Sequence, residues 1–230
     1  MENRKSKDIS EPRTAICGEF PQLSFYATDD SLSEWREFAG HYVAHEFNLL
    51  GSGWVNVCFG MQARGFESVD YSDSRITADA VSEDMTENQK QERSRLLGLA
   101  HELKAGYEPI DWFIDFKSGY RYPLKHFFEI RYGLVEGVDA KVPYDLSRCC
   151  HLTVLARAWQ ETGEERYRRE VMAQMMDWLS ANPVEFGIGW HANMNVAIRL
   201  TNWIVAYSII REGIDASQPA EAAFEKEFAA

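Results

Sequence analysis

Apolar side chains recur every three or four positions along the second half of the chain, which is the spacing of one helical face. This pattern predicts helices at about 145–160, 164–180 and 192–211. Gly163 lies in a tight turn between the first two helices, and Pro183 follows the end of the second. The second half is therefore expected to be a stack of antiparallel helical hairpins.

The first half of the chain is more polar and has fewer regular elements. Residues 1–30 are polar and irregular, which predicts an N-terminal arm, and the next apolar stripe predicts a helix at 31–49. A short β-like run follows at 54–60. Beyond it, the abundance of Ser, Asp, Glu and Gln predicts weak order and one solvent-facing helix at 83–103. The predicted fold class is mainly α, with a small β element near 54–60.

A polar stripe runs along the apolar helix predicted at 192–211. Asn195, Arg199 and Asn202 lie at i, i+4 and i+7, so they share one helical face. The other faces are apolar, which indicates a helix buried on most sides. A buried Arg without partners is costly. The stripe is therefore expected either to find partners inside the protein or to face a groove that holds a polar ligand.

The charge balance narrows the possible partners. The 230 residues carry a formal net charge of −12, with a pI near 5.0, which argues against binding to nucleic acid or to an anionic membrane surface. The longest apolar run, Trp203–Ile210, is far short of a membrane span. The first 20 residues contain no apolar segment typical of a secretory signal. A cytoplasmic protein is the expectation.

The cysteines and histidines give no metal or cofactor signal. None of the four cysteines forms a C-x-x-C pair, so neither a zinc site nor a disulfide framework is indicated. His41 and His45 are four residues apart and could ligate a metal, but no third ligand is evident. We expect these two histidines to be hydrogen-bonded and partly buried, with no metal and no cofactor.

The segment 107–123 combines aromatic rings with charges. Six aromatic residues are interspersed with Asp, Lys and Arg, and Ser118-Gly119 marks a turn. This density of aromatic and charged side chains is typical of a loop that lines a sugar groove. It is equally typical of a hairpin packed against the rest of the protein. Arg148 and His151 are three residues apart, and the helix predicted at 145–160 would place them on one face.

Four blocks of sequence, in this order, resemble the signature of heparinase II/III-like proteins. They are His45–Gly53 (HEFNLLGSG), Ile110–Tyr122, Val138–Arg148 and Asn182–Trp203. Within them, Tyr144 and Tyr122 stand where the family usually has Trp, and Asp145 stands where it usually has Glu. These departures bear on substrate preference more than on fold.

The resemblance implies an incomplete (α/α) toroid at 31–230, followed in full-length members by a β-sandwich. It also implies polysaccharide lyase chemistry, in which uronate-containing glycans such as glycosaminoglycans are cleaved by β-elimination. The Asn, Tyr and His with catalytic roles in the family lie beyond the last matching block, so no catalytic residue is assigned here. The expectation is a truncated copy, inactive alone. The alternative is a non-catalytic protein that binds acidic glycans or other partners.

The expected ligand is an acidic polysaccharide or oligosaccharide bound in one groove. The Lys141 segment and the Trp190-His191 segment would meet at its rim, because both lie at helix N-termini. The residues predicted to line the groove are Trp112, Tyr120, Lys141, Tyr144, Arg148, His151, Trp190, His191, Asn195, Arg199 and Asn202. In the alternative interpretation, Arg148 and Arg199 are internal struts. The sequence leaves the oligomeric state open.

Overall fold

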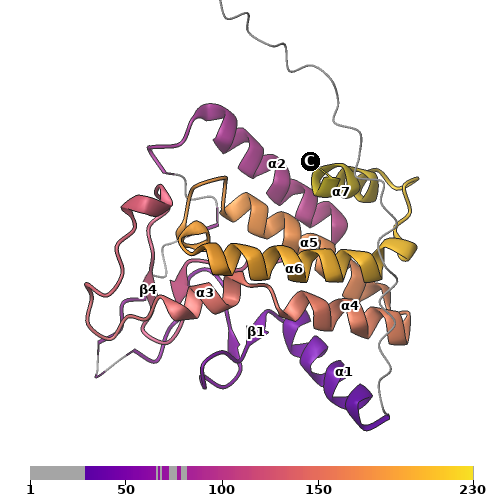
Figure 1. Cartoon of the computed structure of the whole chain (residues 1–230), viewed down its shortest axis with the longest axis horizontal. Coiled ribbons are helices and arrows are strands. Elements are labelled where there is room, and N and C mark those ends of the chain that lie inside the picture. The colour runs from indigo at the N-terminus through magenta and orange to yellow at the C-terminus, as the bar shows by residue number, and fades with distance from the viewer. Residues whose placement is uncertain (1–28, 66, 68, 73–76, 79–81, 230) are drawn as a thin grey trace, which may run out of the picture.

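The computed structural model describes residues 29–229, apart from 66, 68, 73–76 and 79–81 (Figure 1). The arm predicted at 1–30 lies outside the described residues, except for the start of the first helix. The α-helices are α1 (Asp29–Val43), α2 (Glu87–Leu103), α3 (Lys141–Ser147), α4 (His151–Thr162), α5 (Glu165–Ala181), α6 (Asn193–Ile210) and α7 (Pro219–Ala229). Three short 3-10 helices are η1 (Phe127–Glu129), η2 (Ile188–Trp190) and η3 (Arg211–Gly213). The fold is mainly α, as predicted.

Helix α5 forms the centre of the core. It packs against α2 and α4, and α6 packs on α4 (Figure 1). In that view α6 crosses in front of α5, with α2 and α7 on one side and α4 and α1 on the other. Val171, Met172 and Met175 of α5 have no exposed surface, so this helix is enclosed by its neighbours. The predicted antiparallel hairpins are present, and a toroidal arrangement stays a prediction.

The turn between α4 and α5 follows the prediction closely. Gly163 ends α4 with a left-handed backbone, φ 68°, and its N–H donates to the carbonyl of Trp159. Glycine adopts this conformation without the steric cost that a side chain adds. The chain therefore reverses within a few residues. Within the described part of the chain, no helix is long and apolar enough to cross a membrane.

Helix α2 differs from the solvent-facing helix that the charge run predicted. Its start is fixed by a capping box, in which Thr86 and Gln89 exchange hydrogen bonds. Leu96, Leu99 and Leu103 are buried, and the helix packs on α5 and α7. Most of its charged side chains are exposed, but Arg93 is buried and its Nε donates to the carbonyl of Ser180 on α5 at 2.8 Å. The prediction was wrong because charge density hid an apolar stripe of helical spacing.

Two small hairpins lie beside the helices. Strand β1 (Glu46–Phe47) pairs antiparallel with β2 (Val55–Asn56), which confirms the β element near 54–60. It also ends α1 at Val43 rather than at 49, because His45 takes a left-handed backbone, φ 53°. Strands β3 (Ile114–Asp115) and β4 (Tyr120–Arg121) pair across the Ser118-Gly119 turn. The segment 107–123 is therefore a packed hairpin.

The helix predicted at 145–160 is two helices. Helix α3 ends at Ser147 and α4 begins at His151, with Cys149 in a left-handed conformation, φ 54°, between them. The break turns His151 into the core, while Arg148 contacts α6. The prediction that these two residues share one helical face was wrong for this reason.

Candidate functional site

The structure brings together two segments that the sequence separates. The hydroxyl of Tyr144, on α3, lies 3.0 Å from Nδ1 of His191, which follows η2. The ring of Tyr132 meets the His191 ring edge-on, with centroids 4.9 Å apart. Tyr144 and His191 are half-buried, and Tyr132 is 55% exposed. We call the surface formed by Tyr132, Tyr144 and His191 the rim.

Burial sets the protonation states at the rim. It raises the pKa of Tyr144 to about 12, with a further contribution from Tyr132. It also lowers the pKa of His191 below its usual value. At neutral pH both groups are therefore uncharged and hydrogen-bonded to each other. A neutral phenol and imidazole offer donors, acceptors and ring faces, which suit a ligand with many hydroxyl groups.

Arg148 is held by two amides of α6, of which Asn195 is buried, 1% exposed, and so does not line an open groove as predicted. The Nε of Arg148 donates to Oδ1 of Asn195 at 2.9 Å, and its Nη1 pairs with Asp145. The amide of Asn202 donates to the backbone carbonyl of Arg148 at 2.8 Å. The Arg148 side chain keeps 26% of its surface exposed. It is thus held in place by internal partners while part of it stays accessible. Lys141, at the start of α3, is exposed.

Arg199 is an internal strut rather than a groove residue. Only 2% of its surface is exposed, and Nη1 donates to the carbonyls of Ser147 at 3.2 Å and Gly189 at 3.1 Å. The guanidinium lies 3.7 Å from the centroid of the Trp178 ring. Burial lowers its pKa to about 10, so it stays charged at neutral pH. Arg199 therefore fastens α6 to the two segments that carry the rim.

Two aromatic residues predicted to line the groove lie inside the protein. Trp112 has no exposed surface, and its Nε1 donates to Asp177 of α5 at 3.0 Å. His151 is 5% exposed, and its Nε2 donates to Oε1 of Gln174 at 2.7 Å. Their burial corrects the expectation that they line an open groove. Both belong to the polar interior between α5 and the first half of the chain.

Two further predicted residues, Trp190 and Tyr120, have their contacts outside the rim. Trp190 lines a separate cavity of about 320 Å³ beside α2 and donates to the carbonyl of Asn182 at 3.1 Å. Tyr120, on β4, meets Tyr122 edge-on at 5.1 Å. Both Tyr120 and Tyr144 are close enough to Tyr122 to help burial raise its pKa. Tyr120 is therefore near the rim, whereas Trp190 lines a different cavity.

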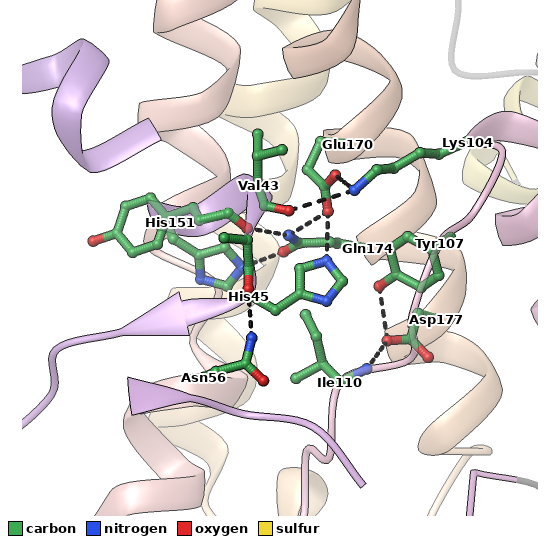
Figure 2. A network of polar contacts seen from close by, with 12 residues as sticks. Val43, His45, Asn56, Lys104, Tyr107, Ile110, His151, Glu170, Gln174 and Asp177 are labelled. Atoms are coloured by element: carbon green, nitrogen blue, oxygen red, sulfur yellow. Dashed lines mark hydrogen bonds and ion pairs between the residues drawn. The ribbon is translucent and has the colours of Figure 1, made fainter. Parts of the chain in front are cut away.

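A buried polar network holds the first half of the chain against α5 (Figure 2). Glu170 is fully buried and accepts hydrogen bonds from Nε2 of His45 at 2.7 Å and from Gln174 at 2.8 Å. It also pairs with Lys104. Burial would raise the pKa of Glu170, but the hydrogen bond and charge of His45, together with Lys104, hold it below its usual range. The network therefore contains an ionised carboxylate.

Asp177 binds the chain that follows α2. Its Oδ2 accepts hydrogen bonds from the hydroxyl of Tyr107 at 2.8 Å and the N–H of Ile110 at 2.9 Å. Burial raises the pKa of Asp177 to about 6, although these bonds act in the opposite direction. The polar residues Glu170, Gln174 and Asp177 are spaced i, i+4 and i+7 on α5. Their helical spacing is visible in the sequence, but this stripe was not among the predicted polar faces.

The histidine pair has protein partners. His41 meets Glu46 at 2.6 Å, and His45 meets Glu170, so each imidazole is matched to a carboxylate. This confirms the expectation of a hydrogen-bonded pair. In the part of the chain that the structure describes, no group of three His, Cys, Asp or Glu side chains is placed to hold a metal ion.

The fold and the rim define a mainly helical protein with an aromatic surface beside antiparallel helical hairpins. The family model described as "Heparinase II/III N-terminus" matches residues 63–218. The chain therefore belongs to this family, which is related to the polysaccharide lyases. No curated protein and no solved structure matches it.

Proposed function

We propose that the rim binds a uronate-containing acidic glycan, as the N-terminal part of a polysaccharide lyase that acts by β-elimination. The observation that carries this proposal is the contact between Tyr144 and His191, to which Tyr132 adds an exposed ring. Family membership supports the same class of ligand. The rim joins segments 47 residues apart in the sequence, and its position depends on the internal strut Arg199.

The side chains around the rim match the chemistry of an acidic sugar. Phenol and imidazole groups can hydrogen-bond sugar hydroxyls, and the Tyr132 ring can stack against a pyranose face. Arg148 and Lys141 supply local positive charge in a chain whose net charge is −12. Charge-assisted hydrogen bonds from such cations to a carboxylate are stronger than neutral ones. A neutral glycan would make no use of the exposed positive charge of Lys141, whereas Arg148 is already paired with Asp145.

The same geometry argues against efficient proton abstraction at the rim. β-Elimination needs a base that removes a proton next to the uronate carboxylate, and an acid for the leaving oxygen. With a pKa of about 12, Tyr144 is almost entirely protonated at neutral pH. His191, with its lowered pKa, is a weak base. We therefore propose that the 230-residue chain binds the glycan without appreciable eliminase activity. This also favours the alternative of a non-catalytic glycan-binding protein.

Calorimetric titration with a uronate-containing tetrasaccharide tests the proposal. We expect Tyr144→Phe to weaken binding about fivefold, since a hydrogen bond to a ligand contributes roughly 1 kcal/mol. Tyr207→Phe is the matched control, because it removes a hydroxyl bonded to Glu225 near the other end of α6. Equal affinity in wild type and Tyr144→Phe would contradict the assignment of the rim. Formation of unsaturated uronate at an ordinary enzymatic rate would contradict the proposed lack of activity.

A further inference from the structure

A second cavity, separate from the rim, lies between the two hairpins. It has a volume of about 390 Å³, and its walls come from the β1–β2 connection, the segment 61–65 and the β3–β4 turn. The lining residues are Gly51, Ser52, Trp54, Val55, Met61, Gln62, Ala63, Arg64, Gly65, Phe116 and Lys117. Its size suits one or two sugar units.

The polar side of this cavity is positively charged. Arg64 and Lys117 both line it, and its described lining residues include no carboxylate. Arg64 is exposed, and no ion pair involves it within the described residues. Lys117 donates through Nζ to the carbonyl of Leu50 at 2.6 Å, which fixes the ammonium at the edge of the cavity. An ammonium has three N–H groups, so two remain for a ligand.

The apolar side of the cavity contains an aromatic ring held firmly in place. Trp54 is half-buried and stacks on His41, with ring centroids 3.9 Å apart and planes within 9°. Phe38 packs at 5.7 Å from the same ring. Met61 and Phe116 complete the apolar wall. An indole next to two cations is suited to a ligand with an apolar face and an anionic substituent.

The cavity between α5 and α7 provides a contrast within the same molecule. It is larger, about 500 Å³, and contains Arg168 and Arg169. Arg168 is already paired with Glu165 and with Glu221, which also lines that cavity. Its positive charge is therefore satisfied internally. The cavity beside Trp54 has cations without such carboxylates, which is the pattern of a surface that receives an anion.

We propose that the cavity beside Trp54 is a binding subsite for an acidic sugar unit. In this arrangement Arg64 and Lys117 bind the anionic group, and the sugar ring lies against Trp54. The proposal rests on the proposed function for the nature of the glycan. The β3–β4 hairpin contributes Lys117 to this cavity and Tyr120 to the neighbourhood of the rim. A glycan lying along this hairpin would reach both places.

Binding of a uronate-containing tetrasaccharide and of its carboxyl-reduced counterpart tests the subsite. The full chain is titrated by calorimetry, and the Trp54 indole N–H is followed by NMR after assignment with Trp54→Phe. We expect Arg64→Ala to weaken binding of the acidic tetrasaccharide about tenfold, with an unchanged melting temperature, because a charge-assisted hydrogen bond is lost. The carboxyl-reduced tetrasaccharide should bind more weakly, and its affinity should not respond to Arg64→Ala.

Arg169→Ala is the matched control, because it removes the same charge at an exposed position of the other cavity. Its affinity should stay within twofold of wild type, and Arg64→Lys should recover part of the loss. Equal losses in Arg64→Ala and Arg169→Ala, or an unmoved Trp54 signal, would overturn the subsite. If Tyr144→Phe weakens binding while Arg64→Ala does not, the subsite fails and the rim stands. If the chain binds neither tetrasaccharide, both proposals fail.

Discussion

Arg199 and Arg64 have the same side chain in opposite settings. Arg199 is 2% exposed and donates to two backbone carbonyls, above a Trp ring. Arg64 is exposed at the edge of a cavity, without an ion pair in the described part of the chain. The difference separates the groups that hold the fold from the groups that remain available to a ligand. Charge alone did not distinguish them in the sequence.

The largest expected effect on stability is at Arg199, the buried arginine of this pair. Arg199→Ala should lower the free energy of unfolding by about 3–5 kcal/mol, because it leaves two buried carbonyls without donors and opens a void beside Trp178. Denaturation by urea measures the change. Arg169→Ala, on the exposed face of α5, should stay within about 0.5 kcal/mol of wild type. A loss below about 1 kcal/mol for Arg199→Ala would show that the strut is dispensable.

The buried network should also make stability depend on pH through His151. Burial lowers its pKa in the folded protein to about 4, below the unfolded value near 6.5. The neutral imidazole therefore stabilises the fold fully above pH 6.5, and this contribution is lost as the pH falls toward 4. A shift of this size corresponds to about 3 kcal/mol.

Comparing wild type with His151→Gln isolates this effect. Asp177 acts in the opposite direction, because its raised pKa makes its contribution disappear as the pH rises toward 6. Both proteins retain Asp177, so the difference between them between pH 6.5 and 4 reports His151. We expect the variant to lose less stability than wild type on acidification. Parallel pH profiles would contradict the assignment of a buried neutral His151.

The smallest expected effect on stability lies at the rim. His191→Ala should cost less than about 1 kcal/mol, because the ring is half-buried and its hydrogen bond to Tyr144 is only partly buried. Thermal unfolding measures this change. A loss as large as that of Arg199→Ala would place His191 among the residues that hold the fold, and it would remove the contrast between the rim and the interior.

The helices of the second half could be predicted because their apolar stripes are regular and their ends carry Gly163 and Pro183. The break between α3 and α4 could not, because the left-handed backbone at Cys149 has no signature in a cysteine. Because this break was missed, His151 was predicted on the wrong helical face. The end of α1 was missed for a similar reason, since His45 also takes a left-handed backbone.

The predictions for the site also succeeded for local features and failed for long-range contacts. The Lys141 segment and the Trp190-His191 segment were predicted to meet because each lies near a helix start, a local feature of the sequence pattern. The contact between Tyr144 and His191 joins these two segments. The burial of Trp112 depends on Asp177, which is 65 residues away in the sequence, and the burial of His151 depends on Gln174 of the next helix. The cavity beside Trp54 also joins distant segments, and none of them has a pattern that indicates the others. Long-range packing of this kind is what the sequence alone did not provide.

A crystal structure of the 230-residue chain with a bound uronate-containing tetrasaccharide would test the central claim most directly. We expect a sugar ring in contact with Tyr132, Tyr144 and His191, with the Arg199 side chain unmoved. A tetrasaccharide bound at a surface that includes none of these three residues would contradict it.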